Sequence, residues 1–152
     1  MTSVLFVCLG NICRSPAGAG ILAHLGMDPG LVVESAGIGD WHVGERADAR
    51  MQAAALQRGI VLSDRARVIR PEDFDRFDYI LAVDHTILYE LYQLAPTPQQ
   101  KAKIHLATAF SPTYHNQDVP DPYYGNDAGF NVVLDMLEDA CEGFLARVKA
   151  KQ

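Results

Sequence analysis

A strand, a short loop and a helix start follow one another within residues 4–16. The apolar run Val4-Leu5-Phe6-Val7 is typical of a buried parallel strand, which places Cys8 at the strand's carboxyl end. Ser15 is a favourable N-cap and Pro16 a favourable first helical residue, so a helix is expected to begin directly after the loop. Ligands of open α/β sheets bind at this edge. The segment therefore predicts an α/β fold with a ligand site around Cys8.

The loop has the residue types that bind an anion. Gly10 lets the backbone turn its N–H groups inward, and Asn11 tolerates a left-handed conformation. Inward N–H groups and a helix N-terminus together attract a phosphate group. Arg14 adds a guanidinium that can bind two phosphoryl oxygens at once. With Arg14 as phosphate ligand, the predicted phosphate-binding loop comprises Leu9, Gly10, Asn11, Ile12, Cys13 and Ser15.

Cys8 is the candidate nucleophile at the base of this loop. A helix N-terminus and the neighbouring Arg14 favour the thiolate form of its side chain. A thiolate attacks phosphorus and later leaves again, and the Ser15 hydroxyl is expected to hydrogen-bond the sulfur. The alternative is a small buried cysteine at a strand end. The surrounding strand, loop and helix start favour a covalent route through a cysteinyl-phosphate.

Asp121 is the candidate proton donor. It lies between Pro120 and Pro122, and a residue before proline is biased toward extended backbone, so a stiff loop is expected to carry its carboxyl. Such a group can protonate a leaving oxygen as general acid and then deprotonate the attacking water as general base. The spacing alone leaves a second interpretation open, in which Asp121-Pro122 only starts a turn.

Apolar runs and helical periodicities alternate along the rest of the chain. Strands are predicted near 4–8, 31–36, 79–83 and 104–107, and helices near 16–26, 46–59, 85–94 and 127–149. This alternation predicts a doubly wound four-stranded parallel sheet with helices on both faces and the phosphate-binding loop after the first strand. The last helix is expected to face the core through Phe130, Val133, Leu134, Leu137, Cys141, Phe144 and Val148. At this length and composition, residues 1–152 are expected to form a single domain.

Charge and apolar pattern exclude several classes of protein. A net charge of −6 argues against a nucleic-acid surface, which needs clustered Lys and Arg. No leader pattern and no long apolar run is present, so we expect a cytoplasmic protein with no membrane partner. The five histidines are scattered, without metal-ligand spacing, and are expected on the surface or in packing roles. We therefore expect no metal and no cofactor.

Four segments, in this order, resemble the low-molecular-weight protein tyrosine phosphatases. They are Cys8-Leu9-Gly10-Asn11-Ile12-Cys13-Arg14-Ser15-Pro16, Ser35-Ala36-Gly37, Glu72-Asp73-Phe74 with Phe77-Asp78-Tyr79-Ile80-Leu81, and Asp121-Pro122-Tyr123-Tyr124-Gly125. The resemblance implies metal-independent hydrolysis of phosphotyrosine in proteins, with Cys8 as nucleophile, Arg14 as phosphate ligand and Asp121 as acid and base. It also implies that Asn11, Ser15 and Ser35 brace the loop.

The chain departs from this family's pattern at two places. Gly18 and Ala19 stand where many members have Ala-Glu, and Gly20 follows. A glycine costs a helix about 1 kcal/mol relative to alanine, so this helix is expected to be looser. Asp64 stands where some members have histidine, so no hydrogen-bond network through that position is assumed.

Trp41 occupies a position where relatives often carry Trp or Tyr beside the active-site mouth. A slot walled by Trp41, Leu9 and Tyr123 would admit a long phenyl phosphate, whereas the shorter phosphoserine would leave the ring faces uncovered. The alternative is that Trp41 is a core residue, but the residues around it have no regular periodicity. The aromatic walls therefore favour phosphotyrosine.

Three cysteines without a secretion signal indicate reduced thiols. Cys141 lies on the predicted core stripe and is expected to be inert. Cys13 lies in the curled loop, and together with the family resemblance this suggests a disulfide with Cys8 that protects the nucleophile from overoxidation. The alternative role for Cys13 is packing.

Several alternatives share the fold. A protein arginine phosphatase typically has threonine where Ile12 stands, so Ile12 favours phosphotyrosine. An arsenate reductase needs further redox cysteines, and beyond Cys8 and Cys13 only Cys141 remains. A catalytically weak phosphotyrosine-binding module would not need to keep all three catalytic candidates. The expected partners are phosphotyrosine-containing proteins, tyrosine kinases among them, and a monomer is favoured.

Overall fold

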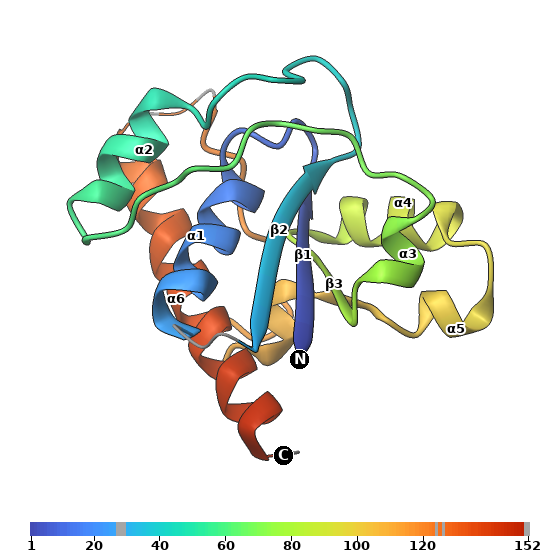
Figure 1. The fold of residues 1–152 in the computed structure, drawn as a ribbon. Coiled ribbons are helices and arrows are strands. Elements are labelled where there is room, and N and C mark those ends of the chain that lie inside the picture. Colours follow the sequence, from blue (N-terminus) through green and yellow to red (C-terminus); the bar gives the residue numbers. More distant parts are fainter. Residues whose placement is uncertain (27–29, 124, 126, 151–152) are drawn as a thin grey trace.

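Four parallel strands form one sheet in the computed structural model, which describes residues 1–26, 30–123, 125 and 127–150. They are β1 (Thr2–Cys8), β2 (Leu31–Gly37), β3 (Tyr79–Ala82) and β4 (Ile104–Leu106). Their order in the sheet is β2-β1-β3-β4. Figure 1 shows the first three of these, with β1 between β2 and β3. The chain therefore winds from β1 to one side and later to the other, which makes the carboxyl end of β1 the switch point.

Helices lie on both faces of this sheet. On one face lie α1 (Arg14–Gly26), α2 (Ala49–Leu56) and α6 (Asp127–Ala150), and on the other lie α3 (Asp73–Arg76), α4 (His85–Leu94) and α5 (Pro98–Lys101) (Figure 1). A 3-10 helix, η1 (Ala107–Phe110), follows β4. The predicted doubly wound fold is confirmed. The short elements α3, α5 and η1 were not predicted, because four residues are too few to display a helical period.

The helix α2 is shorter than the one predicted over 46–59. Asp48 has non-helical backbone, and its side chain accepts a hydrogen bond from the Arg50 N–H, so the helix begins at Ala49. At the other end Gly59 has a φ of 78°, in the left-handed region that glycine favours. The predicted range is therefore too wide at both ends.

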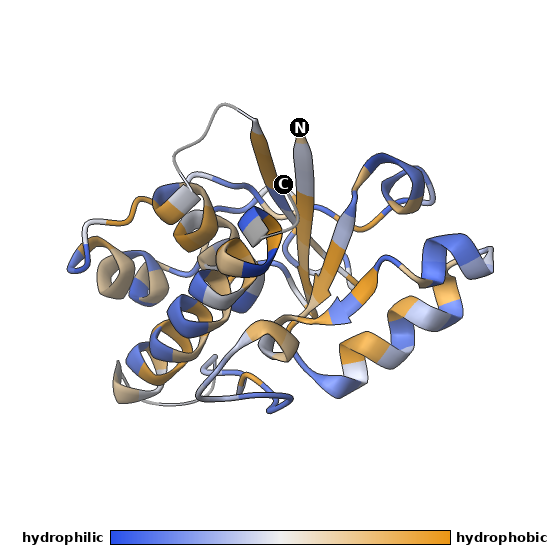
Figure 2. Cartoon of the chain, turned by 90° about the horizontal axis from the view of Figure 1, so that it is seen from below, coloured by the Kyte–Doolittle hydropathy of each residue, from blue (hydrophilic) through white to orange (hydrophobic). Residues whose placement is uncertain are grey.

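The apolar run of β1 lies at the centre of the core. Val4, Leu5, Phe6 and Val7 are at most 1% exposed. Figure 2 shows hydrophobic residues concentrated in the strands, while the helices mix hydrophobic and hydrophilic residues. Of the predicted stripe on α6, the residues from Phe130 to Phe144 are buried and Val148 is partly buried. Within the described residues, no helix is both long and apolar enough to cross a membrane.

Glycines on α1 allow close packing against its neighbours. A Cβ on Gly18 would lie 2.5 Å from a ring carbon of Phe6, which is buried in β1. A Cβ on Gly20 would lie 2.4 Å from a methyl group of Leu62. The two glycines thus have a packing role that helix propensity does not capture.

Candidate active site

The loop after β1 is held by segments that follow β2. Asn11 has a φ of 59°, the left-handed conformation expected for it. The carbonyl of Leu9 accepts a hydrogen bond from the N–H of Gly39 at 2.9 Å. The carbonyl of Ile12 accepts one from the N–H of Asp48 at 2.7 Å. The loop is therefore fixed to the segment that leads into α2.

Two hydrogen-bonding groups contact the thiol of Cys8, which is 3% exposed. The backbone N–H of Asn11 donates to its Sγ at 3.2 Å, and the Oγ of Ser15 lies 2.9 Å from Sγ. The Asn11 amide donates to the same Ser15 oxygen at 2.7 Å. Since this oxygen accepts from Asn11, its own hydrogen points to Sγ or to the more distant Ala36 carbonyl at 3.3 Å. The Asn11 N–H therefore donates to the sulfur, and the Ser15 hydroxyl is within reach to do the same.

Arg14 is buried beside the loop and is bound from the sheet edge. Its Nη1 donates to Asp84 Oδ2 at 2.6 Å and to the carbonyl of Val119 at 3.0 Å. Asp84 also caps α4, where its other oxygen accepts from the N–H of Ile87 at 2.8 Å. The guanidinium is therefore held in one orientation before any ligand arrives.

Asp121 lies near the other terminal nitrogen of the same guanidinium. Its Oδ2 lies 3.7 Å from Arg14 Nη2, while its Oδ1 accepts a hydrogen bond from the N–H of Tyr123 at 3.1 Å. The side chain is 41% exposed, so it remains accessible from the cavity described next. Tyr124, the next residue of the predicted motif, lies outside the described residues.

A cavity of about 380 Å³ connects these groups to the surface. Its lining combines the thiol, the guanidinium, the carboxyl and an aromatic mouth: Cys8, Leu9, Gly10, Ile12, Cys13, Arg14, Trp41, His42, Asp121 and Tyr123. Trp41 is 66% exposed, so it is not a core residue, and its ring lies over Gly39. The site can accept a phosphate at its base and an aromatic group between its walls.

Comparison with known proteins identifies the family of this chain. Residues 3–152 match the family model described as low molecular weight phosphotyrosine protein phosphatase. The chain belongs to this phosphatase family. A low molecular weight protein-tyrosine-phosphatase of Streptomyces coelicolor is 41% identical over 152 residues, which cover 96% of this chain and 93% of that protein.

Solved structures of the family agree with the fold. A protein tyrosine phosphatase from Entamoeba histolytica superposes with a TM-score of 0.94 at 39% identity, covering 99% of both chains. A Drosophila arginine phosphatase superposes with a TM-score of 0.90 at 37% identity, covering 98% of both chains. The α/β architecture, the phosphatase activity and the membership of a hydrolase family are thereby established.

Ser35 and Asp64 interact behind the phosphatase loop. The Ser35 hydroxyl donates to Asp64 Oδ2 at 2.7 Å. Asp64, the residue that departs from the family pattern, therefore does take part in a hydrogen bond. Among the described residues the Ser35 hydroxyl bonds to Asp64 and not to the loop 9–13, so its predicted bracing role rests on the resemblance alone.

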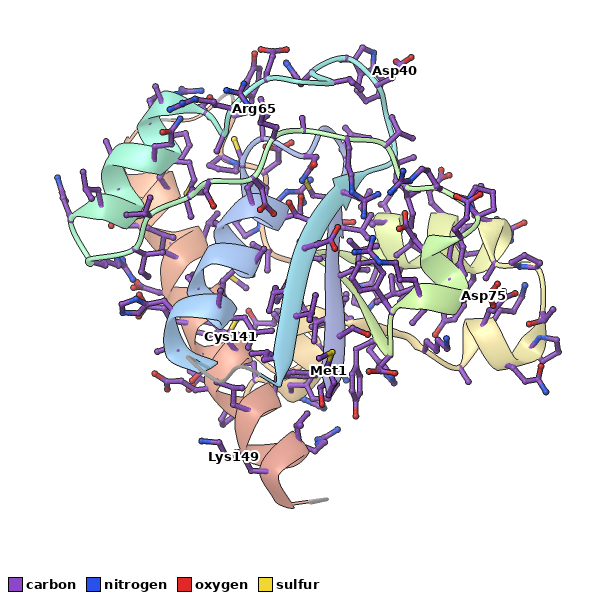
Figure 3. All side chains as sticks on the ribbon, in the orientation of Figure 1. Met1, Asp40, Arg65, Asp75, Cys141 and Lys149 are labelled. Carbon is purple, nitrogen blue, oxygen red and sulfur yellow. The ribbon has the colours of Figure 1, made fainter. Side chains whose placement is uncertain are left out.

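The other two cysteines differ from Cys8. Burial, helped by the charge of Asp48, raises the pKa of Cys13 to about 12. Burial likewise raises the pKa of Cys141, which lies on α6 where it contacts α1, with its Sγ 3.8 Å from the Gly18 carbonyl (Figure 3). All three cysteines are free thiols. Cys13 lines the cavity and Cys141 does not.

The sequence analysis missed two residues of the site. His42, expected on the surface or in packing, lines the cavity, and its Nδ1 is hydrogen-bonded to Glu45 Oε2 at 2.9 Å. Asp84 had a recognisable signal, because it stands between a predicted strand and a predicted helix and so at the carboxyl edge of the sheet. Over the described part of the chain, no cluster of His, Cys, Asp or Glu is arranged to hold a metal ion.

Proposed function

We propose that this phosphatase hydrolyses phosphotyrosine in proteins through a cysteinyl-phosphate intermediate, without a metal. The observation that carries the proposal is the shared cavity. A buried thiol, an oriented guanidinium and an accessible carboxyl line it together with aromatic walls.

In the first step the Sγ of Cys8 forms a bond to phosphorus and the bond from phosphorus to the tyrosine oxygen breaks. Arg14 and the loop N–H groups bind the phosphoryl oxygens, where negative charge builds up. Asp121, protonated at this stage, gives its proton to the departing oxygen. The product is a neutral tyrosine side chain and a phosphorylated cysteine.

In the second step water attacks the phosphorus of the cysteinyl-phosphate. Asp121, now ionised, takes a proton from this water, and the Cys8 sulfur leaves as a thiolate. The Ser15 Oγ at 2.9 Å and the Asn11 N–H at 3.2 Å stabilise that leaving sulfur. Release of inorganic phosphate returns the enzyme to its starting state.

The walls of the cavity support an aromatic substrate. Leu9, Trp41 and Tyr123 line the mouth, so a phenyl ring can be covered while its phosphate reaches Cys8. Ile12 also lines the cavity and adds apolar surface. A phosphoserine is too short to gain this burial, so phosphotyrosine is the favoured substrate.

Phosphoarginine is the second candidate substrate. One structural neighbour is described as an arginine phosphatase, at 37% identity. An arginine side chain carries N–H groups, which an apolar residue at position 12 would leave without acceptors. Ile12 therefore argues for phosphotyrosine.

The test is release of phosphate from a phosphotyrosine peptide in excess EDTA, with phosphoserine and phosphoarginine peptides alongside. We expect turnover of phosphotyrosine only, unaffected by EDTA and abolished by Cys8→Ser. Rapid quenching during turnover should also trap protein-bound phosphate in the wild type and not in Cys8→Ser.

Other outcomes would identify the alternatives. Preference for the phosphoarginine peptide would show that the substrate is phosphoarginine and not phosphotyrosine, while the proposed mechanism would stand. Loss of activity in EDTA, restored by a divalent metal, would overturn the metal-free route. Binding of phosphotyrosine without turnover, even after treatment with reductant, would indicate a binding module.

A further inference from the structure

The first turn of α2 contacts both halves of the active site. Its N-cap, Asp48, donates its backbone N–H to the carbonyl of Ile12 in the phosphate loop at 2.7 Å. Arg50, two residues later, donates from Nη2 to the carbonyl of Tyr123 at 2.9 Å. One short segment therefore holds the loop around Cys8 and the segment that carries Asp121.

Arg50 is itself held in one orientation. Its Nε donates to Asp48 Oδ1 at 3.1 Å and its Nη2 to Asp48 Oδ2 at 2.9 Å, a bidentate pair. Hydrogen bonds from Arg50 hold the pKa of Asp48 below its usual value, so Asp48 stays ionised at neutral pH. The guanidinium carbon also lies 4.8 Å from the ring centre of Phe130 on α6 and 5.7 Å from that of Tyr123.

Tyr123 connects Arg50 to Asp121. Its carbonyl accepts from Arg50 and its N–H donates to Asp121 Oδ1 at 3.1 Å. With Oδ1 engaged in this way, Oδ2 is the oxygen directed toward Arg14, at 3.7 Å. The backbone of Tyr123 therefore determines where the two carboxyl oxygens of Asp121 lie relative to Arg14.

We propose that Arg50 is a positioning residue, which acts through Tyr123 to hold Asp121 over the leaving oxygen. The same contacts orient the Tyr123 ring at the mouth of the cavity. This inference rests on the proposed function. Arg50 is absent from the cavity lining and acts on the proton donor and the aromatic wall from behind.

The dependence of kcat/KM on the leaving group distinguishes positioning of Asp121 by Arg50 from a general effect of Arg50 on the stability of the fold. A phenolate leaves poorly and needs the proton from Asp121, whereas a nitrophenolate is a weaker base and needs it less. A misplaced acid therefore slows phenyl phosphate more than p-nitrophenyl phosphate. A loosened fold or a lower fraction of active enzyme slows both equally.

The experiment compares kcat/KM on these two substrates in the wild type, Arg50→Met, Arg50→Lys and Asp121→Asn. Methionine keeps an apolar stem beside Phe130 and removes the donors. We expect Arg50→Met to lose about ten- to a hundredfold on phenyl phosphate and clearly less on p-nitrophenyl phosphate. Arg50→Lys should recover part of the loss, because an ammonium can reach one acceptor but not form the fork.

Arg58→Met is the matched control. Arg58 follows the same helix and binds Glu138 at 3.1 Å and Asp135 at 3.0 Å on α6, away from the cavity. This variant should lose stability without changing the ratio between the two substrates. If Arg50→Met is too unstable to assay, Arg50→Lys provides the same comparison.

Equal losses on both substrates, or no loss in either Arg50 variant, would overturn the inference. The proposed function fails differently: the wild type would not turn over either substrate, or Asp121→Asn would show no leaving-group dependence. In Asp121→Asn the further change Arg50→Met should have little effect on the ratio, because the acid is already absent.

Discussion

Arg14 is a buried cation balanced by two carboxylates. Asp84 lies 2.6 Å and Asp121 3.7 Å from its guanidinium nitrogens, and the Arg14 side chain is 5% exposed. An unpaired guanidinium in such a place would be costly, and these partners offset that cost. Because Asp84 and the Val119 carbonyl already fix the guanidinium, little reorganisation is needed when a phosphate binds.

Cys13 leads to a prediction about oxidation. Peroxide would convert the Cys8 thiolate to a sulfenic acid, and the Cys13 thiolate would then attack that sulfur, with the hydroxyl leaving as water. Both residues lie in the tryptic peptide that ends at Arg14, so the disulfide should appear there as a loss of two hydrogens. Since the pKa of Cys13 is about 12, the rate of closure should rise about tenfold per pH unit between pH 7 and 9.

Cys13→Ser is the control for this prediction. It should oxidise further at Cys8 to acids that thiol reductants do not reverse, whereas the wild type should regain activity with reductant. If peroxide-treated wild type shows no such peptide, Cys13 has only a packing role.

At the scale of elements, α1 joins the phosphate loop directly to the core. Arg14 and Ser15 begin the helix, and Gly18 lies against Phe6 of β1 one turn later. Glycine lowers helix propensity by about 1 kcal/mol relative to alanine, but here it allows the strand and the helix to approach. The position of the loop therefore depends on this contact.

Gly18→Ala should destabilise the protein despite the better helix former. The new Cβ would lie 2.5 Å from the buried ring of Phe6, and overpacking of this kind costs about 1–3 kcal/mol, more than the propensity gained. The free energy of unfolding in urea measures the effect.

Gly20→Ala is the matched comparison. Its Cβ would lie 2.4 Å from a methyl group at the end of the Leu62 side chain, which can rotate away, while Ile60 and the Val61 carbonyl lie at ordinary contact distances of 3.4 and 3.7 Å. We expect Gly20→Ala to be closer to neutral than Gly18→Ala. The reverse order would show that helix propensity, not packing against β1, decides the stability of α1.

At the scale of the whole molecule, one hydrophobic cluster extends from the sheet to α6. Phe144 of α6 is 1% exposed, and its ring lies 5.0 Å from that of Tyr79 at the start of β3 and 5.2 Å from that of Phe110 in η1. This contact lies at the end of the sheet opposite the active site, since Tyr79 begins its strand and Cys8 ends its own. Cys8 at one end of the sheet and Phe144 at the other belong to the same buried cluster.

We propose that residues 1–152 unfold as a single cooperative unit. Phe144→Ala should then lower the free energy of unfolding by about 3–5 kcal/mol. The loss of phosphatase activity and the loss of far-UV circular dichroism should shift together to lower urea concentration. Separate transitions for the two probes would indicate more than one folding unit.

Much of the site could be predicted because its signals are local. The apolar strand before Cys8 and the left-handed Asn11 each depend on neighbours in the sequence, and the structure has both. The helix start was predicted two residues too late, because α1 begins at Arg14 and Ser15 lies inside it, where its hydroxyl bonds to Cys8 and Asn11 instead of capping the helix. The period of α6 was equally readable, because a long helix repeats its pattern many times. The short α3, α5 and η1 lack such a repeat.

The sequence by itself determined the order along the chain of the four strands and the four longer helices, the anion-binding loop and the candidates Cys8, Arg14 and Asp121. Only the tertiary structure decided that Arg14 pairs with Asp84, that His42 lines the cavity and that Arg50 binds the Tyr123 carbonyl. These contacts join residues far apart in the chain. They depend on which loops lie next to each other at the carboxyl edge of a parallel sheet. A local sequence pattern does not indicate which distant loops will be neighbours.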